Sequence, residues 1–461
     1  MKFSIIVAFL AICFILKYSN VYAQGGVSPS VKSETPASSV SVSDEKTPQF
    51  GEWSIHFQAT SITQTHSYFH SAYSGQNSLL SNYEIPSTGT ATLFIGHKLW
   101  SNAYLFANPE ESMGSGLAST HGIAAFPNGE SFRVDDPNPL TSLSRLFIQQ
   151  EFGFGGGKEK VEDDLNQFSA EKDIHRLTLV AGKFSLNDYF DNNSYSHDPR
   201  TQFLNWALMD TGAWDYAADT RGYTWGVMTE FHEAQWSIRA AIAQVPVTAN
   251  GIKLEGDLTH AHAENIEGEY RYQIHESPGK LRVLYFSNQA HMGSYRDAIN
   301  LGVKTSTVPD VTATRAYRTK SGFGINLEQE LTPDLGVFSR LGYNDGATET
   351  WSFTEIDRSI SLGASLKGTS WKRQSDVLGL ALLWDGLSQD HQDYLAAKGL
   401  GFLIGDGGLS YAPEEVIEAY YCYQFLKELS ITLDFQGVNH PGFNADRGPV
   451  AIYGLRLHYE I

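Results

Sequence analysis

The chain has 461 residues, a formal net charge of −19 and an aromatic content of 13%, with 23 Tyr and 26 Phe. This charge makes nucleic acid an unfavourable partner, because binding to phosphate groups is carried by Lys and Arg. Many aromatic residues and 42 glycines are typical of a β-rich protein, either a membrane barrel or a large secreted enzyme or lectin.

The N-terminus is predicted to be a secretory signal peptide over residues 1–23. Lys2 precedes an apolar run that ends at Leu16, and a small-residue cleavage motif lies just before Gln24. The apolar run is too short for a transmembrane helix. After cleavage Cys422 is the single cysteine, so an intramolecular disulfide is excluded in the exported protein.

Residues 24–48 are rich in Ser, Pro, Val and Thr without periodicity, which predicts a disordered periplasmic leader. From residue 49 to residue 461 apolar and polar residues alternate in one segment after another, as in β-strands. An even number of such segments suits a bacterial single-chain barrel. The sixteen predicted strands span 51–62, 89–98, 100–108, 143–152, 175–183, 222–231, 235–244, 265–275, 279–288, 321–331, 335–344, 351–366, 376–385, 414–424, 429–438 and 449–461.

The predicted connections mostly alternate between short and long, as short periplasmic turns and long external loops would. Two of them break the rule: 153–174 is long on the periplasmic side, and 345–350 is short on the external side. Short links are expected at 99, 232–234, 276–278, 332–334 and 425–428, and long ones at 63–88, 109–142, 184–221, 245–264, 289–320 and 386–413.

The alternation separates an apolar face from a charged face in the predicted strands. In 265–275, Ile266 and Tyr270 share one face, and Glu267 and Glu269 share the other. An Arg or Lys facing lipid at mid-bilayer costs about 2–4 kcal/mol, so the charged faces are expected to line a wet lumen. A soluble β-sandwich is the alternative, but the regular strands and the many long loops favour a membrane barrel. The predicted fold class is therefore all-β, with a sixteen-stranded antiparallel transmembrane β-barrel.

Enzyme and metal motifs are weak. The glycine cluster that begins at Gly153 lacks the Ser or Thr of a phosphate loop and is predicted to be a turn. His260 and His262 have no third ligand at a diagnostic spacing, and the segment 188–193 is expected to be a solvated loop although its oxygens suit calcium. We therefore predict no catalytic residue, no cofactor and no metal site.

The charged side chains on the lumen face are the one group of residues whose chemistry suggests a function. Strand 143–152 places Arg145, Gln149 and Glu151 on one face, and such donors and acceptors, with nearby aromatic rings, bind the hydroxyls and apolar faces of sugars. The alternative is that lumen charges only balance one another and hydrate the pore. The other predicted lumen-facing residues are Arg239, Arg271, Glu328, Arg340 and Arg456. The apolar segment 203–216 is the candidate for a constriction, or else a lid on the barrel rim.

Four long stretches resemble the carbohydrate-selective porins of the OprB type. They read QTHSYFHSAYSGQNSL, RLFIQQEFGFGG, LVAGKFSLNDYFDNNSYSHDPRTQFLNWALMDTGAWDYAADTRGYTWG and LDFQGVNHPGFNADRGPVAIYGLRLHYE. The resemblance implies a barrel in the bacterial outer membrane that passes glucose and related small sugars by facilitated diffusion. Its matching motifs point to Arg145, Glu151, Lys183, Asp210, Trp214, Asp215, Arg221, Glu418 and Arg456 as pathway residues.

The expected function is therefore passive, carbohydrate-selective diffusion. A less specific or anion-preferring porin is the first alternative, and a barrel-embedded hydrolase is the second. The expected partners are small sugars, outer-membrane lipid and lipopolysaccharide, and the oligomeric state stays open between a monomer and a homotrimer.

Overall fold

The computed structural model describes residues 52–131 and 136–461. The predicted signal peptide (1–23) and the predicted leader (24–48) lie outside the described residues. The predicted barrel, by contrast, falls almost entirely within them.

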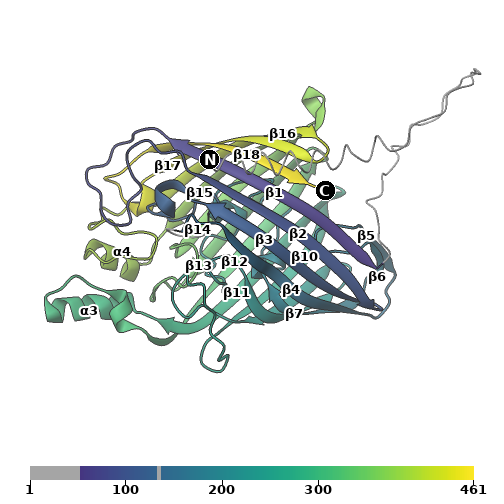
Figure 1. Cartoon of the computed structure of the whole chain (residues 1–461), viewed down its shortest axis with the longest axis horizontal. Helices are drawn as coiled ribbons and strands as arrows, with labels where there is room; N and C mark the ends of the chain where they lie inside the picture. Colours follow the sequence, from purple (N-terminus) through teal and green to yellow (C-terminus); the bar gives the residue numbers. More distant parts are fainter. Residues whose placement is uncertain (1–51, 132–135) are drawn as a thin grey trace, which may run out of the picture. The chain divides into compact units, whose positions relative to one another are not determined.

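Sixteen of the described strands close into one antiparallel barrel, in which β1 pairs with β18 (Figure 1). The predicted fold class is confirmed, because each predicted strand corresponds to one barrel strand. The strands are β1 (Trp53–His66), β2 (Ser87–Trp100), β3 (Ala103–Gly114), β4 (Leu140–Gly153), β7 (Arg176–Phe184), β8 (Thr224–His232), β9 (Trp236–Ala243), β10 (His262–Ile274), β11 (Ser277–Met292), β12 (Ala316–Thr332), β13 (Leu335–Asn344), β14 (Arg358–Gly368), β15 (Arg373–Gly386), β16 (Glu414–Leu426), β17 (Leu429–Asn439) and β18 (Val450–Glu460).

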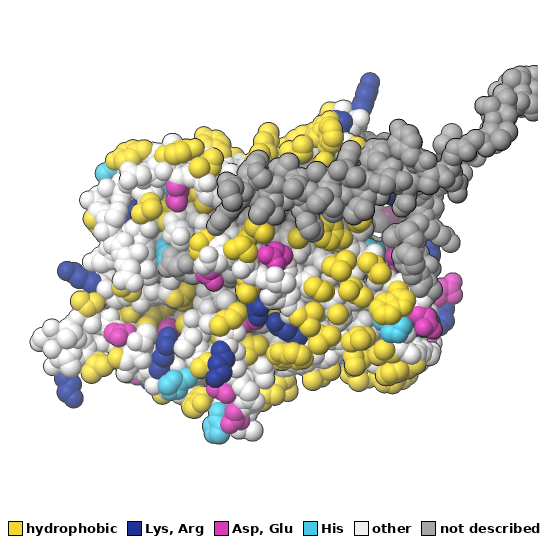
Figure 2. Space-filling view, viewed as in Figure 1, with side chains coloured by type: hydrophobic (Ala, Val, Ile, Leu, Met, Phe, Trp, Pro, Cys, Tyr) yellow, Lys and Arg dark blue, Asp and Glu magenta, His cyan; other side chains and the backbone are white. Residues whose placement is uncertain are grey.

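The alternation along each strand separates the outside of the barrel from its inside. Leu433 and Ile266 face outward and are 63% and 51% exposed, whereas the inward-facing Arg456 and Glu267 are 0% exposed. Hydrophobic side chains accordingly cover much of the outer wall in the view of Figure 2. An apolar outer band with polar residues inside is the pattern that a bilayer requires of a barrel.

The two ends of the barrel differ in their connections. At one end the links are tight turns, such as the one between β10 and β11, and at the other end long segments carry the helices α3 and α4 (Figure 1). Ser294 caps α3 by accepting a hydrogen bond from the Asp297 backbone N–H. The helical elements are α2 (Trp206–Met209), α3 (Tyr295–Thr305), α4 (Gln389–Ala396), η1 (Leu117–Thr120), η2 (Leu186–Asp188), η3 (Val311–Thr314), η4 (Thr369–Trp371) and η5 (Pro441–Phe443). Among the described residues, no helix combines the length and the apolar character needed to cross a bilayer.

Two connections differ from expectation. The predicted strand 351–366 begins only at Arg358, because Trp351 and Phe353 are 1% exposed and pack inside the barrel as part of a loop, so their alternation does not mark a wall. The long link 153–174 contains a two-stranded sheet, β5 (Lys158–Val161) paired with β6 (Ala170–Asp173), which the sequence did not predict. Gly155, Gly156 and Gly157, with positive φ, form the turn before β5, which confirms the turn predicted there.

Candidate functional site

The loop between β7 and β8, residues 185–223, folds into the barrel. Phe203 and Leu204 are 0% exposed, and the Phe203 ring packs edge-on against Tyr420 of β16 at 4.9 Å between centroids. Trp206 of α2 stacks on Phe353 at 4.5 Å. The apolar segment 203–216 therefore lies inside the barrel, packed against its wall.

Arginines of the wall hold the backbone of this loop. Arg340 of β13 donates to the carbonyls of Leu208 (2.7 Å) and Ser196 (2.6 Å). Arg456 of β18 donates to the carbonyls of Pro199 (2.7 Å) and Gln202 (2.6 Å). Both arginines are thus covered by the loop that they bind.

Carboxylates of the wall bind the same loop through its N–H groups. Glu418 of β16 accepts from the backbone of Leu204 at 2.6 Å and of Asn205 at 3.0 Å. Glu328 of β12 accepts from the Ser194 backbone at 2.8 Å. Buried backbone N–H groups need a hydrogen-bond partner, and these side-chain oxygens supply it, so the contacts fix the path of the loop.

A glycine of the wall makes room for one aromatic residue of the loop. A Cβ atom at Gly336 of β13 would lie 2.0 Å from the ring of Tyr195. The loop can reach the wall here only because this position carries no side chain.

We expect Gly336→Val to displace Tyr195 and with it the loop, at a cost of about 1–3 kcal/mol for overpacking. Single-channel recordings should then show altered conductance and more open-channel noise than the unmodified protein. Gly256→Val is the matched control, because a Cβ atom at Gly256 meets nothing within 4 Å. Equal recordings from both variants would contradict the close packing at Gly336.

The infolded loop leaves a cavity of about 520 Å³ against β1, β2 and β4. Three inserted segments complete its walls: the loop after β3, which contributes Glu130, the loop 185–223, and the connection that carries β5 and β6. Its charged and aromatic lining residues include Glu130, Arg145, Lys172, Asp188, Arg200, Trp206, Tyr216, Arg221 and Tyr223.

Tyr223 lies at the centre of the charged groups of this cavity. The Arg145 guanidinium is 5.1 Å from the centre of its ring, and the Lys183 ammonium is 5.7 Å from it. The Tyr223 hydroxyl lies 3.1 Å from Glu110 and donates to that carboxylate. Cations this close to an aromatic face are attracted by its quadrupole, so the ring and both cations hold one another in place.

The cationic side chains around the cavity are each paired with a carboxylate. The pairs are Arg145 with Asp188 (2.7 Å), Arg200 with Glu130 (3.0 Å), Arg221 with Asp219 (2.7 Å), Lys172 with Glu151 (2.5 Å) and Lys183 with Asp219 (3.7 Å). Gln149 also donates to Glu151 at 2.8 Å. The wall therefore presents donors and acceptors side by side with its charges largely balanced.

Burial shifts the pKa values of groups in the loop. Burial, and then the neighbouring Arg340, lowers the pKa of His197, which favours the neutral imidazole. Burial, and then Asp191, raises the pKa of Asp210, whose carboxyl group accepts from Asn187. Burial would lower the pKa of Arg200, but the carboxylates of Glu130 and Glu110 outweigh burial and raise it.

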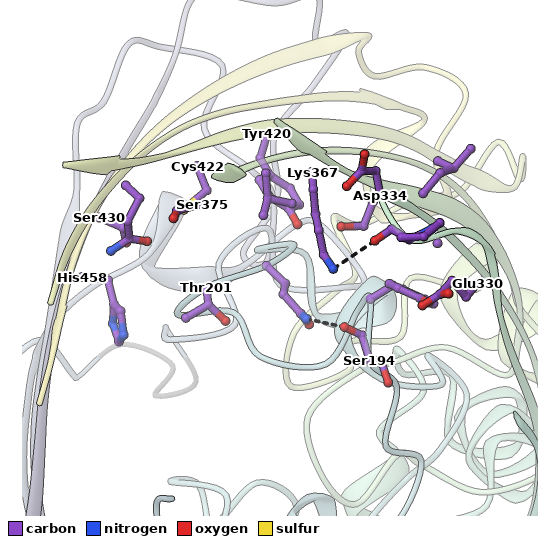
Figure 3. Close-up of a pocket in the computed structure, with 18 of the residues that line it drawn as sticks. Ser194, Thr201, Glu330, Asp334, Lys367, Ser375, Tyr420, Cys422, Ser430 and His458 are labelled. Atoms are coloured by element: carbon purple, nitrogen blue, oxygen red, sulfur yellow. Dashed lines mark hydrogen bonds between the residues drawn. The ribbon is translucent and has the colours of Figure 1, made fainter. Parts of the chain in front are cut away.

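A second cavity, also of about 520 Å³, opens at the end of the barrel with the tight turns (Figure 3). Ser194 and Gln202 of the infolded loop face it from one side, and Ser375 and Tyr420 of the wall line it from the other. Within its lining the Gln202 amide donates to the Ser194 carbonyl at 2.9 Å. The loop 185–223 thus contributes to both cavities.

The predicted pathway residues fall into three groups. Arg145, Gln149 and Arg221 line the first cavity, and Glu151 and Lys183 bond to its lining. Arg271 lies apart, at the far end of β10, where it pairs with Glu269 and donates to the carbonyl of Trp236. The remaining residues fix the infolded loop or belong to it: Asp210, Trp214, Asp215, Arg239, Glu328, Arg340, Glu418 and Arg456.

Three members of the third group connect the infolded loop to the barrel wall or to another loop in different ways. Trp214 donates to Asn265 of β10 at 3.1 Å. Asp215 accepts from the Trp351 backbone at 2.9 Å. Arg239 binds Glu267 at 2.6 Å, a carboxylate that also accepts from a backbone N–H of the loop.

Several lining residues were not predicted from the sequence, among them Glu130, Lys172, Asp188, Arg200 and Tyr223. The first four lie in predicted connections, where strand alternation gives no signal. Tyr223 falls inside the predicted strand 222–231, but β8 begins only at Thr224, so this residue belongs to the loop. Asp188, Arg200 and Tyr223 are nevertheless inside the longest stretch that resembles the porin family, which was the available sign.

The prediction of a solvated loop at 188–193 is wrong. Asp191 is 1% exposed and pairs with Arg340 at 3.0 Å inside the barrel. His260 is on an external loop and bonds to Asp257 at 2.7 Å. Among residues 52–131 and 136–461, no group of three or more His, Cys, Asp or Glu side chains is arranged to hold a metal ion.

Comparison with known proteins adds three findings. The model of the carbohydrate-selective porin, OprB family, matches residues 90–460. Porin AaxA of Chlamydia pneumoniae is 23% identical over 287 residues, which are 62% of this chain and 56% of that relative, so the chain matches little more than half of its length. The high-pH structure of Pseudomonas putida OprB superimposes with a TM-score of 0.67 at 15% identity, over 89% of this chain and 94% of that one, and this likeness confirms the barrel fold.

Proposed function

Because the chain belongs to the OprB family of carbohydrate-selective porins, we propose that it lets small sugars such as glucose diffuse passively across the bacterial outer membrane. The protein is an outer-membrane β-barrel porin, and its apolar outer wall meets the acyl chains of membrane lipid. The proposed route runs through the cavity around Tyr223.

The lining of this cavity is the observation that carries the proposal. Paired charges such as Arg145 with Asp188 offer fixed donors and acceptors, and the parts of the Tyr223, Trp206 and Tyr216 rings that line the cavity offer aromatic surface. A sugar has many hydroxyls, no charge and apolar ring faces, so it can use both kinds of surface. Binding must stay weak, because a solute held tightly would not leave the pore.

The balanced charges favour a neutral solute over the anion preference of the alternative porin. An anion-selective pore would be expected to present cations without carboxylate partners at its narrow point. Arg145, Arg200 and Arg221 each have such a partner. The proposed process is diffusion without a chemical step, and a detectable turnover of esters or glycosides by the purified protein would instead favour the hydrolase.

Swelling of liposomes that contain the purified protein tests the proposal. We expect faster swelling in glucose than in neutral amino acids of similar size, whereas protein-free liposomes should not distinguish them. Equal rates for sugars and amino acids would replace sugar selectivity by general diffusion. A reversal potential measured across a KCl gradient would reveal an anion preference directly.

We expect Arg145→Ala to reduce the preference for sugars by about twofold or more, because pore selectivity depends on the diameter and on the groups that line it. The substitution removes the partner of Asp188, so the ion current should also shift towards cations. Swelling rates and reversal potentials measure the two effects. Arg373→Ala is the control, since Arg373 pairs with Asp376 at the end of β15, away from the cavity. Unchanged selectivity in Arg145→Ala would exclude this route.

A further inference from the structure

The hairpin of β5 and β6 is an insertion at the end of the barrel where other links are tight turns (Figure 1). Its tip is a turn closed by two backbone hydrogen bonds, from Asp164 to the Gln167 carbonyl (3.1 Å) and from Gln167 to the Asp164 carbonyl (2.9 Å). Asn166 has a positive φ of 55°, a conformation that Asn tolerates in turns. The tip is therefore a defined structure.

One side of the hairpin packs against the barrel wall. The ring of Phe168 stacks on Tyr104 at 4.9 Å, and Asn108 donates to Asn166 at 2.9 Å. A Cβ atom at Gly96 of β2 would lie 2.8 Å from the Phe168 ring, so the wall leaves a space that this ring fills. These contacts fix the tip inside the barrel mouth.

An ion pair and a polar contact strengthen the same attachment. Lys172 of β6 lies 2.5 Å from Glu151 of β4, and the two side chains are only 12% and 7% exposed. Asp163 lies 3.2 Å from His56 of β1. A charge pair this poorly hydrated is costly to break, because either partner alone would stay buried without compensation.

The other side of the hairpin faces the cavity around Tyr223. Leu165, Asn166 and Gln167 line it together with Arg145. The loops 185–223 and the one carrying Glu130 bound this cavity from the external side, so the tip bounds it from the periplasmic side.

We propose that the tip Leu165–Gln167 is the inner size filter of the pore, and that the amides of Asn166 and Gln167 contact passing neutral polyhydroxy solutes. The Asn166 carbonyl accepts from Asn108 and the Gln167 amide donates to the Glu162 carbonyl, which leaves the Asn166 NH₂ group as a donor and the Gln167 carbonyl as an acceptor for solute hydroxyls. The identity of the solute rests on the proposed function, whereas the narrowing by the tip does not.

The first test removes residues 158–172, so that Gly157 joins Asp173. The barrel ladder between β4 and β7 does not include these residues. We expect larger single-channel conductance, access for larger polyethylene glycols, and a swelling rate for trisaccharides that rises relative to glucose by about twofold or more. An unchanged polymer cut-off in a variant that is folded, as judged by heat-modifiable electrophoretic mobility, would overturn the proposal.

A matched pair of point variants keeps the test decisive if the deletion variant fails to fold. Leu165→Trp enlarges a side chain that lines the cavity, whereas Glu171→Trp places the same ring on an exposed position of the same hairpin. We expect the first to lower conductance and glucose flux by about twofold or more and the second to leave both unchanged. Equal behaviour of the two variants would overturn the proposal.

The readouts separate this proposal from the proposed function. Conductance and polymer exclusion report the width of the pore without any sugar. A changed cut-off with no preference for sugars over amino acids would support the filter and contradict sugar selectivity. Sugar selectivity with an unchanged polymer cut-off would support the proposed function and contradict the filter.

Discussion

Replacing Arg340 by Ala raises the single-channel conductance and weakens the discrimination between sugars, while the barrel stays folded. The substitution removes the donors to the carbonyls of Leu208 and Ser196 and the ion pair with Asp191. Breaking a buried pair of this kind costs about 3–5 kcal/mol, and here the cost falls on the seating of the loop 185–223. The hydrogen-bond ladder of β13 with β12 and β14 does not involve the side chain.

Recordings in planar bilayers measure the conductance, and heat-modifiable mobility measures the folded fraction. Arg340→Lys serves as the conservative variant, because it keeps the positive charge beside Asp191 but not the planar fork of donors. We expect its conductance to fall between those of the unmodified protein and Arg340→Ala. A variant Arg340→Ala with unmodified conductance, or one with no folded barrel, would contradict the anchoring role.

Placing Arg at Leu433 blocks membrane insertion. Leu433 is 63% exposed on the outer wall, where its neighbours across the strands are Tyr421 and Leu455. An Arg near the bilayer midplane costs about 2–4 kcal/mol, so the folded fraction in liposomes should fall sharply.

The control for Leu433→Arg is Ser375→Arg, because Ser375 lines the cavity at the end of β15 and meets water there. Refolding from urea into liposomes, followed by electrophoresis without heating, compares the two. We expect only Leu433→Arg to fail, and equal yields would mean that the outer and inner faces are assigned incorrectly.

Strand alternation predicted the wall of the barrel well because it depends only on neighbouring residues. Leu433 and Leu455 are exposed on the outside and Arg456 is buried on the inside, as their positions in the sequence indicate. The same reasoning failed at Trp351 and Phe353, which are buried in a loop: Phe353 stacks on Trp206 of the infolded loop, and Trp351 donates to the Pro246 carbonyl. Local pattern cannot distinguish a wall from a loop that is buried within it.

The site was harder to predict for the same reason. Arg145 and Arg340 both lie on inward faces, and the sequence treats them alike, yet Arg145 lines the cavity and Arg340 holds the loop. The difference arises from where the loop 185–223 is seated. That seating depends on residues far apart in the chain, and a single sequence does not report it.

The anchors of the infolded loop come late in the chain. Leu204 is bound by Glu418, 214 residues further on, and Pro199 by Arg456, 257 residues further on. Contacts between residues this distant form late, because closing so long a segment costs entropy before any bond repays it. The loop 185–223 is therefore synthesised well before β16 and β18, and it can take its final position only when these last strands have closed the barrel against β1.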